Sequence, residues 1–591
     1  MKNLINKSEL ISKLQTLEGL TNDERSSLIG LLRQHKKYGL VWEDKPEDVE
    51  ERLRDELPVL QEVKEKAILS DEPDAPNHIL IEGDNIEALT ALSYTHEGKI
   101  DVIYIDPPYN TGNKDFVYND SFVDTEDSYR HSKWLSFMSK RLKIAKKLLS
   151  DKGVIFISID DNEQANLKLL CDEVLGVKNF VSTLIWKSKS GGANDSSSFG
   201  VDHEYLICYA SKIENVALNN DKNAAVTTSY NKIDENGKRY ALDRLDKQSL
   251  GYLASLDFPI IGPDGKVYTV EHKNPANKKA RWRWGQDTVK ERYDELVFIY
   301  PYVYTKNYEK EDGQKPRSIL FDERFGRTRT GSTDLASVVG KQSIFSYPKP
   351  VSLIKFIASI STQPYSTILD FFAGSGTTLH ATMQLNAEDG GHRQCILVTN
   401  NENNICEEVT YERNKRVIND YTTPKGVEVA GLKQNTLRYY KTDYISRDRT
   451  QKNMRALVAA ATDLLCIKED LYEEQNTFGR FKLKPQLARY FNNGKRHMLI
   501  VYREELIDEI AAEIKNVDFG KMRLKIYVFS PGRYAFTDNF REVEDKVELV
   551  ALPAAIYDAY QKVLPKRREK LFEDEKEEIK IPTDLFEGQG I

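Results

Sequence analysis

The sequence predicts an α/β protein built on a buried, mostly parallel sheet. Short apolar runs at residues 79–81 and 154–159 alternate with segments whose apolar residues repeat at helical spacing, such as residues 135–149. Runs that are apolar almost throughout are typical of strands covered on both faces. The same pattern resumes at residues 367–370, where a Gly-rich turn separates the strand from a helix. We therefore expect two halves of one sheet domain, separated in the chain.

Size and composition indicate a multidomain protein. At 591 residues the chain exceeds what one core accommodates, and about three or four domains are expected. With a net charge of −7, contact with nucleic acid would depend on a local basic surface. The five cysteines form no Cys-x-x-Cys pair and lie near no His cluster, so we expect no metal site and no disulfides. We expect a cytoplasmic protein without membrane contact, because no signal peptide or membrane-length apolar run is visible.

Five segments are expected along the chain. Leu10, Leu14 and Leu17 share one helical face, and a capping box at Thr21 and Glu24 precedes a second helix, so the N-terminus is expected to form a helical hairpin. Packing on the main domain and dimerisation are equally open as its role. The segments are an N-terminal helical segment (1–60), the first half of the sheet domain (61–190), a polar insert (191–335), the second half of the sheet domain (336–435) and a C-terminal α/β domain (436–591).

The first candidate site is the tetrapeptide Asp106-Pro107-Pro108-Tyr109, which follows the strand-like run at residues 101–105. The prolines fix φ and prevent a helix from continuing, so the Pro107 carbonyl projects from the strand end beside the Asp106 carboxylate. Two such acceptors suit an exocyclic amino group, as in adenine or cytosine, and Tyr109 can stack on the flat base. The pattern therefore favours methylation of an amino group; the alternative is a strand followed by a Pro-Pro turn.

The second candidate site is the turn after the strand that ends at Asp370. Its sequence, Phe372-Ala373-Gly374-Ser375-Gly376, leads into a helix and lets backbone approach a ligand closely. The Phe-x-Gly-x-Gly spacing differs from the dinucleotide pattern G-x-G-x-x-G and matches the loop that wraps the methionine moiety of S-adenosylmethionine. The next strand, residues 394–398, leads to Glu402, or alternatively Asn400, as the side chain that holds ribose hydroxyls.

Basic residues supply further candidates. Lys349 stands between two prolines, where it either faces a cofactor carboxylate or serves only to start a helix. Within the insert, cations and aromatic rings are interleaved, which suits phosphate neutralisation and stacking on bases. The alternative is a solvated basic face whose tryptophans anchor the insert's own core. The residues expected to contact nucleic acid are Lys279, Arg281, Trp282, Arg283, Arg327 and Arg329.

Together, these motifs resemble those of the β-group amino-methyltransferases of DNA. In that family the Asp-Pro-Pro-Tyr motif precedes the Phe-x-Gly-x-Gly motif and the target-recognition region lies between them, which is the order found here. Residues 38–42, 81–85, 106–116 and 400–408 also look like those of the modification subunit of Type III restriction-modification systems. The resemblance covers nearly the whole chain and is weakest in the insert.

The resemblance implies a Rossmann-like sheet, S-adenosylmethionine as methyl donor, and adenine N6 in a short asymmetric duplex site as acceptor. Such a base must be flipped out of the duplex to be reached. A homodimer that associates with an ATP-dependent restriction subunit is also implied. The catalytic residues would be Asp106, Pro107, Pro108 and Tyr109. The residues expected at the cofactor are Asp84, Asp106, Lys349, Asp370, Phe372, Ala373, Gly374, Ser375, Gly376 and Glu402.

Several alternatives stay open on the sequence. Cytosine N4 is also an exocyclic amine, although Asp rather than Ser at position 106 favours adenine in this family. The same reaction could serve regulation in an orphan methyltransferase. A protein-glutamine methyltransferase is disfavoured by Asp106 and by the motif order, and a DNA-binding subunit without activity is disfavoured because both motifs are intact. No G-x-x-x-x-G-K-[ST] loop is present, so DNA translocation and cleavage would require another polypeptide.

Overall fold

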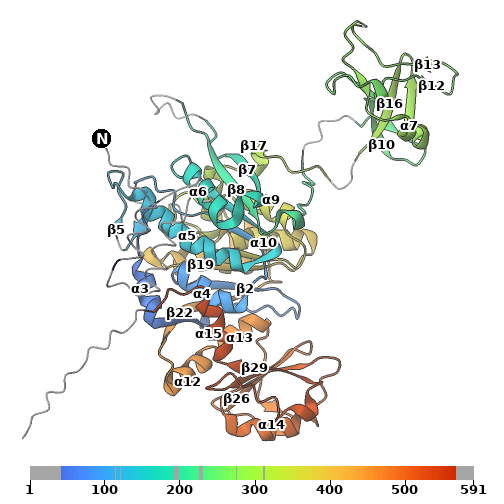
Figure 1. Ribbon diagram of the computed structural model, residues 1–591. Helices are drawn as coiled ribbons and strands as arrows, with labels where there is room; N and C mark the ends of the chain where they lie inside the picture. The colour runs from blue at the N-terminus through green and yellow to red at the C-terminus, as the bar shows by residue number, and fades with distance from the viewer. Residues whose placement is uncertain are drawn as a thin grey trace, which may run out of the picture. The chain divides into compact units, whose positions relative to one another are not determined.

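The computed structural model describes residue 17 and residues 42–113, 115–119, 121–191, 199–224, 230–274, 276–309, 313–341 and 343–567. The chain forms two compact units (Figure 1). Leu218–Arg317 make up the insert unit, and the described residues before and after this segment make up the main unit. The predicted N-terminal hairpin and the charged tail beyond residue 567 lie outside the described residues.

The main unit is organised around a ten-stranded sheet with the order β1-β22-β2-β19-β18-β3-β6-β8-β7-β17. Its strands are β1 (Glu56–Glu62), β2 (Asn77–Glu82), β3 (Ile100–Ile105), β6 (Leu149–Ile159), β7 (Phe180–Lys187), β8 (His203–Ala210), β17 (Ile319–Leu320), β18 (Thr367–Asp370), β19 (Gln394–Thr399) and β22 (Thr436–Ser446). Neighbouring strands from β22 to β6 are parallel. On the two sides of this parallel part, β1 pairs antiparallel with β22, and β8 pairs antiparallel with β6. The predicted α/β class is confirmed.

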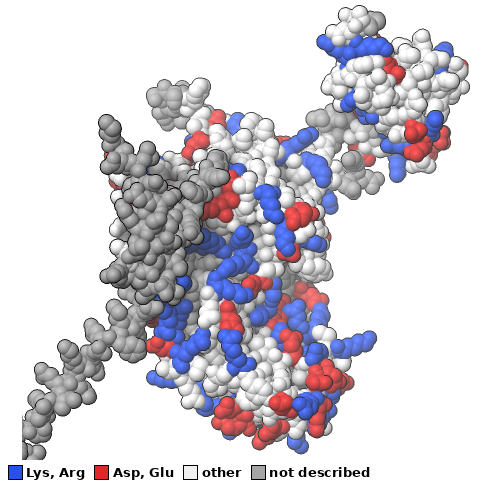
Figure 2. Space-filling view, in the orientation of Figure 1, with Lys and Arg blue, Asp and Glu red and all other residues white. Residues whose placement is uncertain are grey.

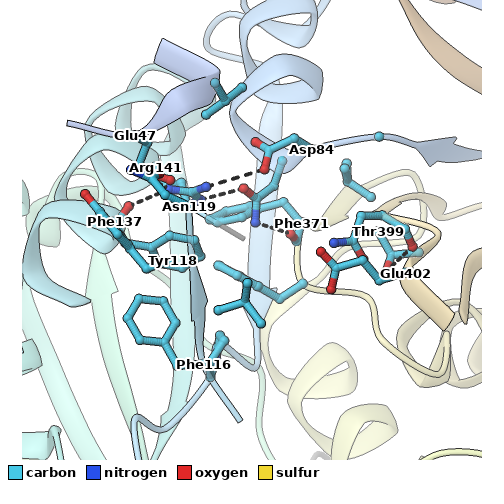
Figure 3. Close-up of a pocket in the computed structure, with 18 of the residues that line it drawn as sticks. Glu47, Asp84, Phe116, Tyr118, Asn119, Phe137, Arg141, Phe371, Thr399 and Glu402 are labelled. Carbon is cyan, nitrogen blue, oxygen red and sulfur yellow. Dashed lines mark hydrogen bonds and ion pairs between the residues drawn. The ribbon is translucent and has the colours of Figure 1, made fainter. Parts of the chain in front are cut away.

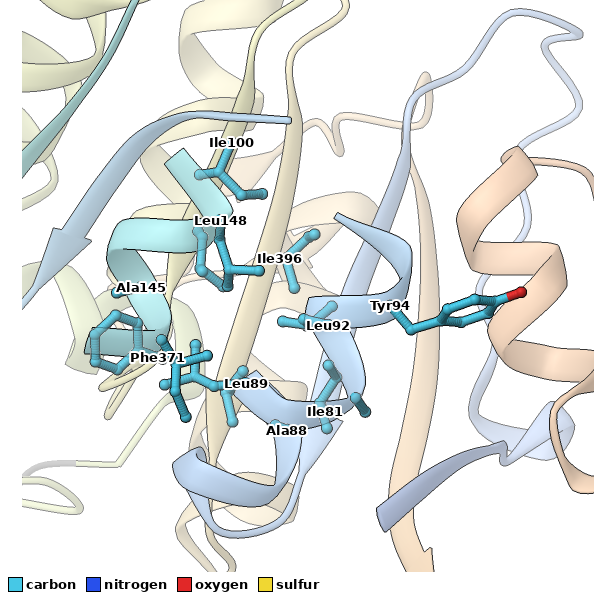
Figure 4. Packing of buried hydrophobic residues seen from close by; sticks show 14 of the residues in the cluster. Ile81, Ala88, Leu89, Leu92, Tyr94, Ile100, Ala145, Leu148, Phe371 and Ile396 are labelled. Carbon is cyan, nitrogen blue, oxygen red and sulfur yellow. The ribbon is translucent and has the colours of Figure 1, made fainter. Parts of the chain in front are cut away.

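Helices cover both faces of this sheet, as buried parallel strands require. One face carries α4 (Asn85–Thr95), α5 (Arg130–Leu148) and α6 (Gln164–Cys171); the other carries α8 (Thr328–Val339), α9 (Val351–Ser361), α10 (Thr377–Asp389) and α11 (Glu412–Ile418). The side chains on the face that carries α4, α5 and α6 form one apolar core, and Figure 4 shows Leu89 of α4, Leu148 of α5 and Ile396 of β19 in it. Side chains alternate between the two faces along β19, so Cys395 and Leu397 belong to a second apolar core on the face that carries α8 to α11. In the described part of the chain, no helix is both long and apolar enough to span a bilayer.

One edge of the main sheet collects the carboxyl ends of β2, β19, β18 and β3, because these strands are parallel neighbours. From β3 the chain continues to β6 in one direction, and from β18 it continues to β19 in the other. The connections therefore diverge between β3 and β18. In open α/β sheets, ligands bind outside the carboxyl ends of the strands at such a point.

The C-terminal part of the main unit has a second sheet of five strands, in the order β23-β26-β27-β28-β29. Its strands are β23 (Glu474–Gln475), β26 (Ala488–Asn492), β27 (His497–Val501), β28 (Leu524–Phe529) and β29 (Val547–Leu552), and α14 (Ile507–Ile514) shares their core. The helices α12 (Gln451–Ala460), α13 (Thr462–Glu469) and α15 (Ala554–Gln561) contribute side chains to the cluster that contains α4 and β1. This domain is thus joined to the main sheet by a continuous apolar core.

The insert unit is a small β domain with a core of its own. Its four-stranded sheet has the order β15-β16-β10-β9. The elements are β9 (Lys232–Ile233), β10 (Arg239–Arg244), β11 (Asp246–Lys247), β12 (Ile260–Ile261), β13 (Val267–Tyr268), β14 (Arg281–Trp282), α7 (Gln286–Glu291), β15 (Leu296–Ile299) and β16 (Tyr302–Tyr308). Leu245, Tyr268, Trp282 and Val303 lie in the core.

The observed boundaries differ from the predicted ones. The expected insert, residues 191–335, includes β8 and β17, which pair with β6 and β7 of the main sheet, and most of α8, which packs against α11. The unit with its own core is narrower, Leu218–Arg317. Similarly, β1 and β22 complete the main sheet, although they begin in the segments assigned to the two ends of the chain. Composition marks polar stretches but does not show which strands pair across them.

The packing of α8 predicts a position where no side chain fits. A Cβ at Gly331 would lie 1.9 Å from the carbonyl oxygen of Pro348. We expect Gly331→Ala to displace this contact and to destabilise the protein by about 1–3 kcal/mol, as overpacking does. The measurement is the midpoint of thermal unfolding. Gly532→Ala is the matched control, because a Cβ there meets nothing within 4 Å, and equal midpoints for the two variants would contradict the packing.

Candidate active site

The polar residues that follow four neighbouring strands lie along one edge of the main sheet. Asp84 follows β2, Asp106 follows β3, Asp370 ends β18, and Asn400 and Glu402 follow β19. Because these strands run parallel, their carboxyl ends share that edge. The fold thus places the two sequence motifs on adjacent strands, β3 and β18, at the point where the connections diverge.

At the end of β3, Asp106 belongs to a cluster of four side chains. The Lys349 ammonium donates to Asp106 Oδ1 and Oδ2 at 2.9 and 2.8 Å and to the Tyr109 hydroxyl at 2.9 Å. The Tyr109 hydroxyl also lies 2.9 Å from Asp106 Oδ1 and from Glu204 Oε2. Lys349 Nζ is 3.3 Å from Glu204 Oε2. Lys349 therefore binds the tetrapeptide itself, an arrangement that neither sequence interpretation of this lysine included.

Two carboxylates and one ammonium determine the protonation of this cluster. Burial opposes the charged form of Lys349, but the carboxylates of Asp106 and Glu204 outweigh it and raise the pKa of the ammonium. Burial and the same carboxylates raise the pKa of Tyr109 well above its ordinary value, so the phenol stays protonated. The Lys349 side chain is 9% exposed and that of Asp106 is 26% exposed, so the carboxylate is the more accessible partner.

Glu204 is a member of this cluster that sequence reasoning missed. It lies on β8, and alternation along the strand places it on the same face as Leu206 and Cys208, which are each 1% exposed. A carboxylate on the buried face of a strand is rare unless it is paired. That pattern is the signal which the sequence offered, and the contact with Lys349 explains it.

The turn that carries Asp106 is held from two sides by buried groups. The indole Nε1 of Trp134, a fully buried residue of α5, donates to the Pro108 carbonyl at 2.7 Å. Asn110 has a φ of 57°, which Asn tolerates better than most residues, and its amide donates to Glu163 Oε1 at 2.6 Å. The Pro108 carbonyl therefore already accepts a hydrogen bond from the protein. The carbonyl that the sequence predicts as the acceptor for an amine is a different one, that of Pro107.

A cavity of about 340 Å³ opens beside this turn, and Pro108 is part of its lining (Figure 3). Aromatic rings form one part of the wall: the Phe137 ring centroid lies 5.2 Å from that of Phe116 and 5.8 Å from that of Phe372. The polar lining includes Asp84, Asn85, Asp115, Asn119, Thr399, Asn400 and Glu402. The cavity therefore combines an apolar wall of mutually inclined rings with acceptors that suit hydroxyl and ammonium groups.

Arg141 of α5 holds the polar end of the cavity and was not predicted. Its side chain is 1% exposed, and its guanidinium donates to Asn85 Oδ1 at 2.5 Å and to Glu47 Oε1 at 2.9 Å. Asp84 Oδ2 lies 3.7 Å from Arg141 Nη2, and Figure 3 shows the guanidinium between Glu47 and Asp84. A buried charge that loses its partner is strongly destabilising. Arg141 therefore holds Glu47, just before α3 (Asp48–Asp55), and Asn85, the first residue of α4, in position.

The Gly-rich turn has a different environment from the expected one. Asp370 is 2% exposed and accepts hydrogen bonds from the Phe372 N–H at 3.0 Å and Thr378 Oγ1 at 2.6 Å, so its carboxylate braces the turn. Gly374 and Gly376 have φ of 49° and 72°. A Cβ on Gly374 would lie 2.9 Å from Phe345 Cζ, and a Cβ on Gly376 would lie 2.4 Å from Asn414 Nδ2. These glycines are thus approached closely by the protein's own side chains.

The predicted cofactor residues fall into three groups. Asp84, Phe372 and Glu402 line the cavity. Asp106 and Lys349 lie in the neighbouring charged cluster. The turn behind the cavity contains Asp370, Ala373, Gly374, Ser375 and Gly376, and none of these five lines it. The fully buried Arg413 donates to the carbonyl of Ser375 at 3.3 Å and to its hydroxyl at 3.1 Å, which further anchors the turn.

The predicted nucleic-acid contacts divide into buried and exposed residues. Trp282 is 1% exposed in the core of the insert unit, and its Nε1 donates to the Phe258 carbonyl at 2.7 Å, which is the arrangement expected if the tryptophans anchor the insert's own core. Arg283 is paired with Asp243 at 3.2 Å, and Arg327 donates to three backbone carbonyls of its own turn. Alternation on β14 turns Trp282 inward. Lys279 and Arg329 are exposed, and Arg281 is half-buried.

Fold and site together define an α/β protein with a cavity and a charged Asp-Pro-Pro-Tyr cluster beside the carboxyl ends of its parallel strands, where the connections diverge. The chain belongs to the DNA methylase family N6_N4_Mtase, whose family model matches residues 100–423, more than half of the chain. The family resemblance inferred from the two motifs is thereby confirmed.

Curated relatives include two Type III enzymes. The Mod subunit of EcoPI from Escherichia phage P1 is 34% identical over 376 residues, which cover 55% of this chain and 58% of that protein. The Mod subunit of StyLTI from Salmonella typhimurium is 32% identical over 364 residues, 55% of this chain and 52% of that protein. The Type II methyltransferase M.KpnI from Klebsiella pneumoniae is 34% identical over 360 residues, which cover 58% of this chain and 84% of that protein. The chain thus spans about half the length of the Type III relatives.

The buried Asp370 predicts a pH dependence of stability. Burial raises its pKa to about 7, against hydrogen bonds from Thr378 and Phe372 that favour the anion. Because the unfolded value is about 4, the folded protein binds the extra proton, and this contribution to stability is lost as the pH rises from about 4 through about 7. Asp370→Asn keeps acceptor and donor groups without the charge. We expect its thermal midpoint to fall less than that of the wild type between about pH 5 and pH 7; parallel curves would contradict the assignment.

Proposed function

We propose that this chain is an S-adenosylmethionine-dependent DNA methyltransferase that modifies adenine N6 in a short asymmetric duplex site, as the modification subunit of a Type III restriction-modification system. The observation that carries this proposal is the Asp106 cluster beside a cavity with aromatic and carboxylate lining. Membership of the DNA methylase family supports the reaction class, and similarity to two Type III Mod subunits supports the system.

The residues of the cavity fit S-adenosylmethionine. Glu402, exposed after β19, offers a carboxylate to ribose hydroxyls, and the Phe372 ring offers an apolar wall to the methionine portion. The Asp84 carboxylate suits the ammonium group of the methionine portion. When bound, the cofactor supplies a methyl group on a positively charged sulfur, so the protein mainly has to align the reacting atoms.

Asp106 holds the target amino group in this proposal. A carboxylate has about four acceptor positions. Lys349 occupies one on each oxygen, and Tyr109 approaches Oδ1, so Oδ2 keeps a position for an amine hydrogen. The Pro107 carbonyl is the second acceptor. As the new C–N bond forms, the nitrogen has to lose one proton, and in this proposal Asp106 Oδ2 receives it.

The target base has to leave the duplex to reach Asp106, because base flipping is the way an enzyme reaches an atom inside the stack. Flipping costs roughly a few kcal/mol, and stacking on Tyr109 returns about 1–3 kcal/mol. Contacts to phosphates must therefore supply most of the net affinity, and binding should weaken with salt. Exposed Lys279 and Arg329 are candidates. On the face shown in Figure 2, basic side chains gather across the middle of the main unit among scattered acidic ones.

Assembly completes the proposal. A homodimer and an ATP-dependent restriction subunit as partner rest on the family resemblance and on the Type III relatives, which are themselves Mod subunits. Light scattering of the purified chain tests the dimer: a single species of twice the chain mass is expected, and a monomer would refute it.

A direct assay tests the reaction. The purified chain is incubated with duplex DNA of mixed sequence and S-adenosylmethionine that carries a labelled methyl group. Mass spectrometry of the nucleosides is expected to show N6-methyladenine. Detection of N4-methylcytosine would show that the target base is cytosine. The absence of any methylated nucleoside would overturn the proposed function. Modification-aware sequencing of DNA from cells that express the chain then identifies the site.

Asp106→Ala tests the amine acceptor. Without this carboxylate the amino group is neither held nor deprotonated, so we expect the single-turnover rate to fall by about 10²–10⁴-fold. Because Asp106 is not part of the cavity lining, binding of S-adenosylmethionine measured by calorimetry should be nearly unchanged. Near-normal turnover in the variant would rule out the assigned role, and loss of cofactor binding would show that the site is misassigned.

Tyr109 variants separate the ring from the hydroxyl. Tyr109→Phe keeps the stacking surface and loses the contacts to Asp106 and Glu204, whereas Tyr109→Ala loses both. We expect methyl transfer by the Ala variant to be roughly ten- to a hundredfold slower, with the Phe variant in between. Filter binding should show a much smaller change in duplex affinity. If the Ala variant loses duplex binding in step with turnover, the stacking role is wrong.

A further inference from the structure

Residues 343–349 connect the two halves of the site. Phe345 packs against the Gly-rich turn, where its ring leaves no room for a Cβ on Gly374. Lys349, four residues later, reaches Asp106 at 2.8 Å. The segment then enters α9 through Pro350. Its first and last anchors therefore lie at the cofactor turn and at the catalytic carboxylate, respectively.

Tyr347 lies between these two anchors in the sequence. Its side chain is 77% exposed, although Pro348 and Lys349 beside it are buried. Its φ is 53°, a left-handed conformation that a bulky residue rarely adopts, and Ser343 has a φ of 57°. The exposed Tyr347 ring contributes no burial energy that could offset its unfavourable backbone conformation. Packing within the fold therefore does not explain this conformation. Residues held in such conformations cluster at active sites, ligand clamps and switch regions.

The surroundings of Tyr347 suit a nucleic acid. It lines a hollow of about 200 Å³ together with Lys341, three serines and four apolar residues: Ser332, Ser343, Ser346, Leu335, Ala336, Ile344 and Phe345. No carboxylate is among the described residues that line this hollow. Hydroxyl and ammonium donors bind phosphate and sugar, while an aromatic face accepts any base. Arg329, three residues before Ser332 on α8, is a second exposed cation on the helix that contributes to this lining.

We propose that Tyr347 is a DNA-contact residue whose ring stacks on a base next to the flipped nucleotide, while Lys341 and the three serines bind the adjoining backbone. This inference rests on the proposed function, because it requires a duplex at the rim of the Asp106 cluster. The ring fills space that the flipped base leaves in the stack, and so favours the open form. Tyr347 acts on positioning and takes no part in the transfer itself.

The test uses the full chain and a duplex that contains the site identified by sequencing, with 2-aminopurine in place of the target adenine. Affinity is measured by fluorescence anisotropy, and flipping by the rise in 2-aminopurine fluorescence. Glycine tolerates a positive φ, so Tyr347→Gly removes the ring without straining the backbone and should keep the thermal midpoint. We expect it to lower duplex affinity roughly ten- to a hundredfold and to reduce the flipping signal. Tyr347→Phe should behave as the wild type.

Tyr365→Ala is the matched control. Tyr365 is 79% exposed, but it precedes β18, at the opposite end of the strand from the site. Its loss should leave duplex affinity, flipping and cofactor binding unchanged. Wild-type affinity and flipping in Tyr347→Gly would overturn the proposal, as would a changed oligomeric state in that variant, which would make this surface a contact between copies. Failure of the proposed function is distinguishable, because the wild type would then methylate no DNA.

Discussion

The contact between Lys349 and Asp106 is the interaction around which the charged cluster of the site is built. The two residues are 243 positions apart, one before α9 and the other after β3, so they meet only when both halves of the chain have joined one sheet. Lys349 is largely buried, and a buried ammonium without a partner carries a desolvation cost of several kcal/mol. The ion pair thus couples completion of the sheet to placement of the carboxylate.

The same constraint accounts for the neighbours of this pair. Glu204 adds a second carboxylate, and together the two raise the pKa of Lys349 and keep Tyr109 protonated. Trp134 and Asn110 hold the turn that carries Asp106, so the carboxylate is presented by rigid elements. Arg141 does the equivalent for the cavity, where one buried guanidinium joins segments that are distant in the chain. A site built in this way is already organised before a ligand arrives.

Agreement between sequence and structure is closest where the signal is local. Apolar runs identified the central strands, and the prolines marked the turn after β3, because both effects act within a few residues. Long-range pairing was not readable: the buried strand face marks Glu204 as unusual but does not identify its partner, and Arg141 looks like an ordinary charged residue until its partners are known. Interleaved rings and cations leave two roles open, because a tryptophan on a short strand can either face a ligand or complete a small core, as Trp282 does.

The sequence by itself determined the α/β class, the two motifs and their order, because apolar periodicity and turn chemistry are properties of short segments. The tertiary structure alone decided which residues complete the site. It paired Lys349 with Asp106, used the glycines of the turn for close internal packing, and narrowed the insert to Leu218–Arg317. Each of these outcomes depends on which strands become neighbours in the sheet, and that choice is made by the whole core rather than by any one segment.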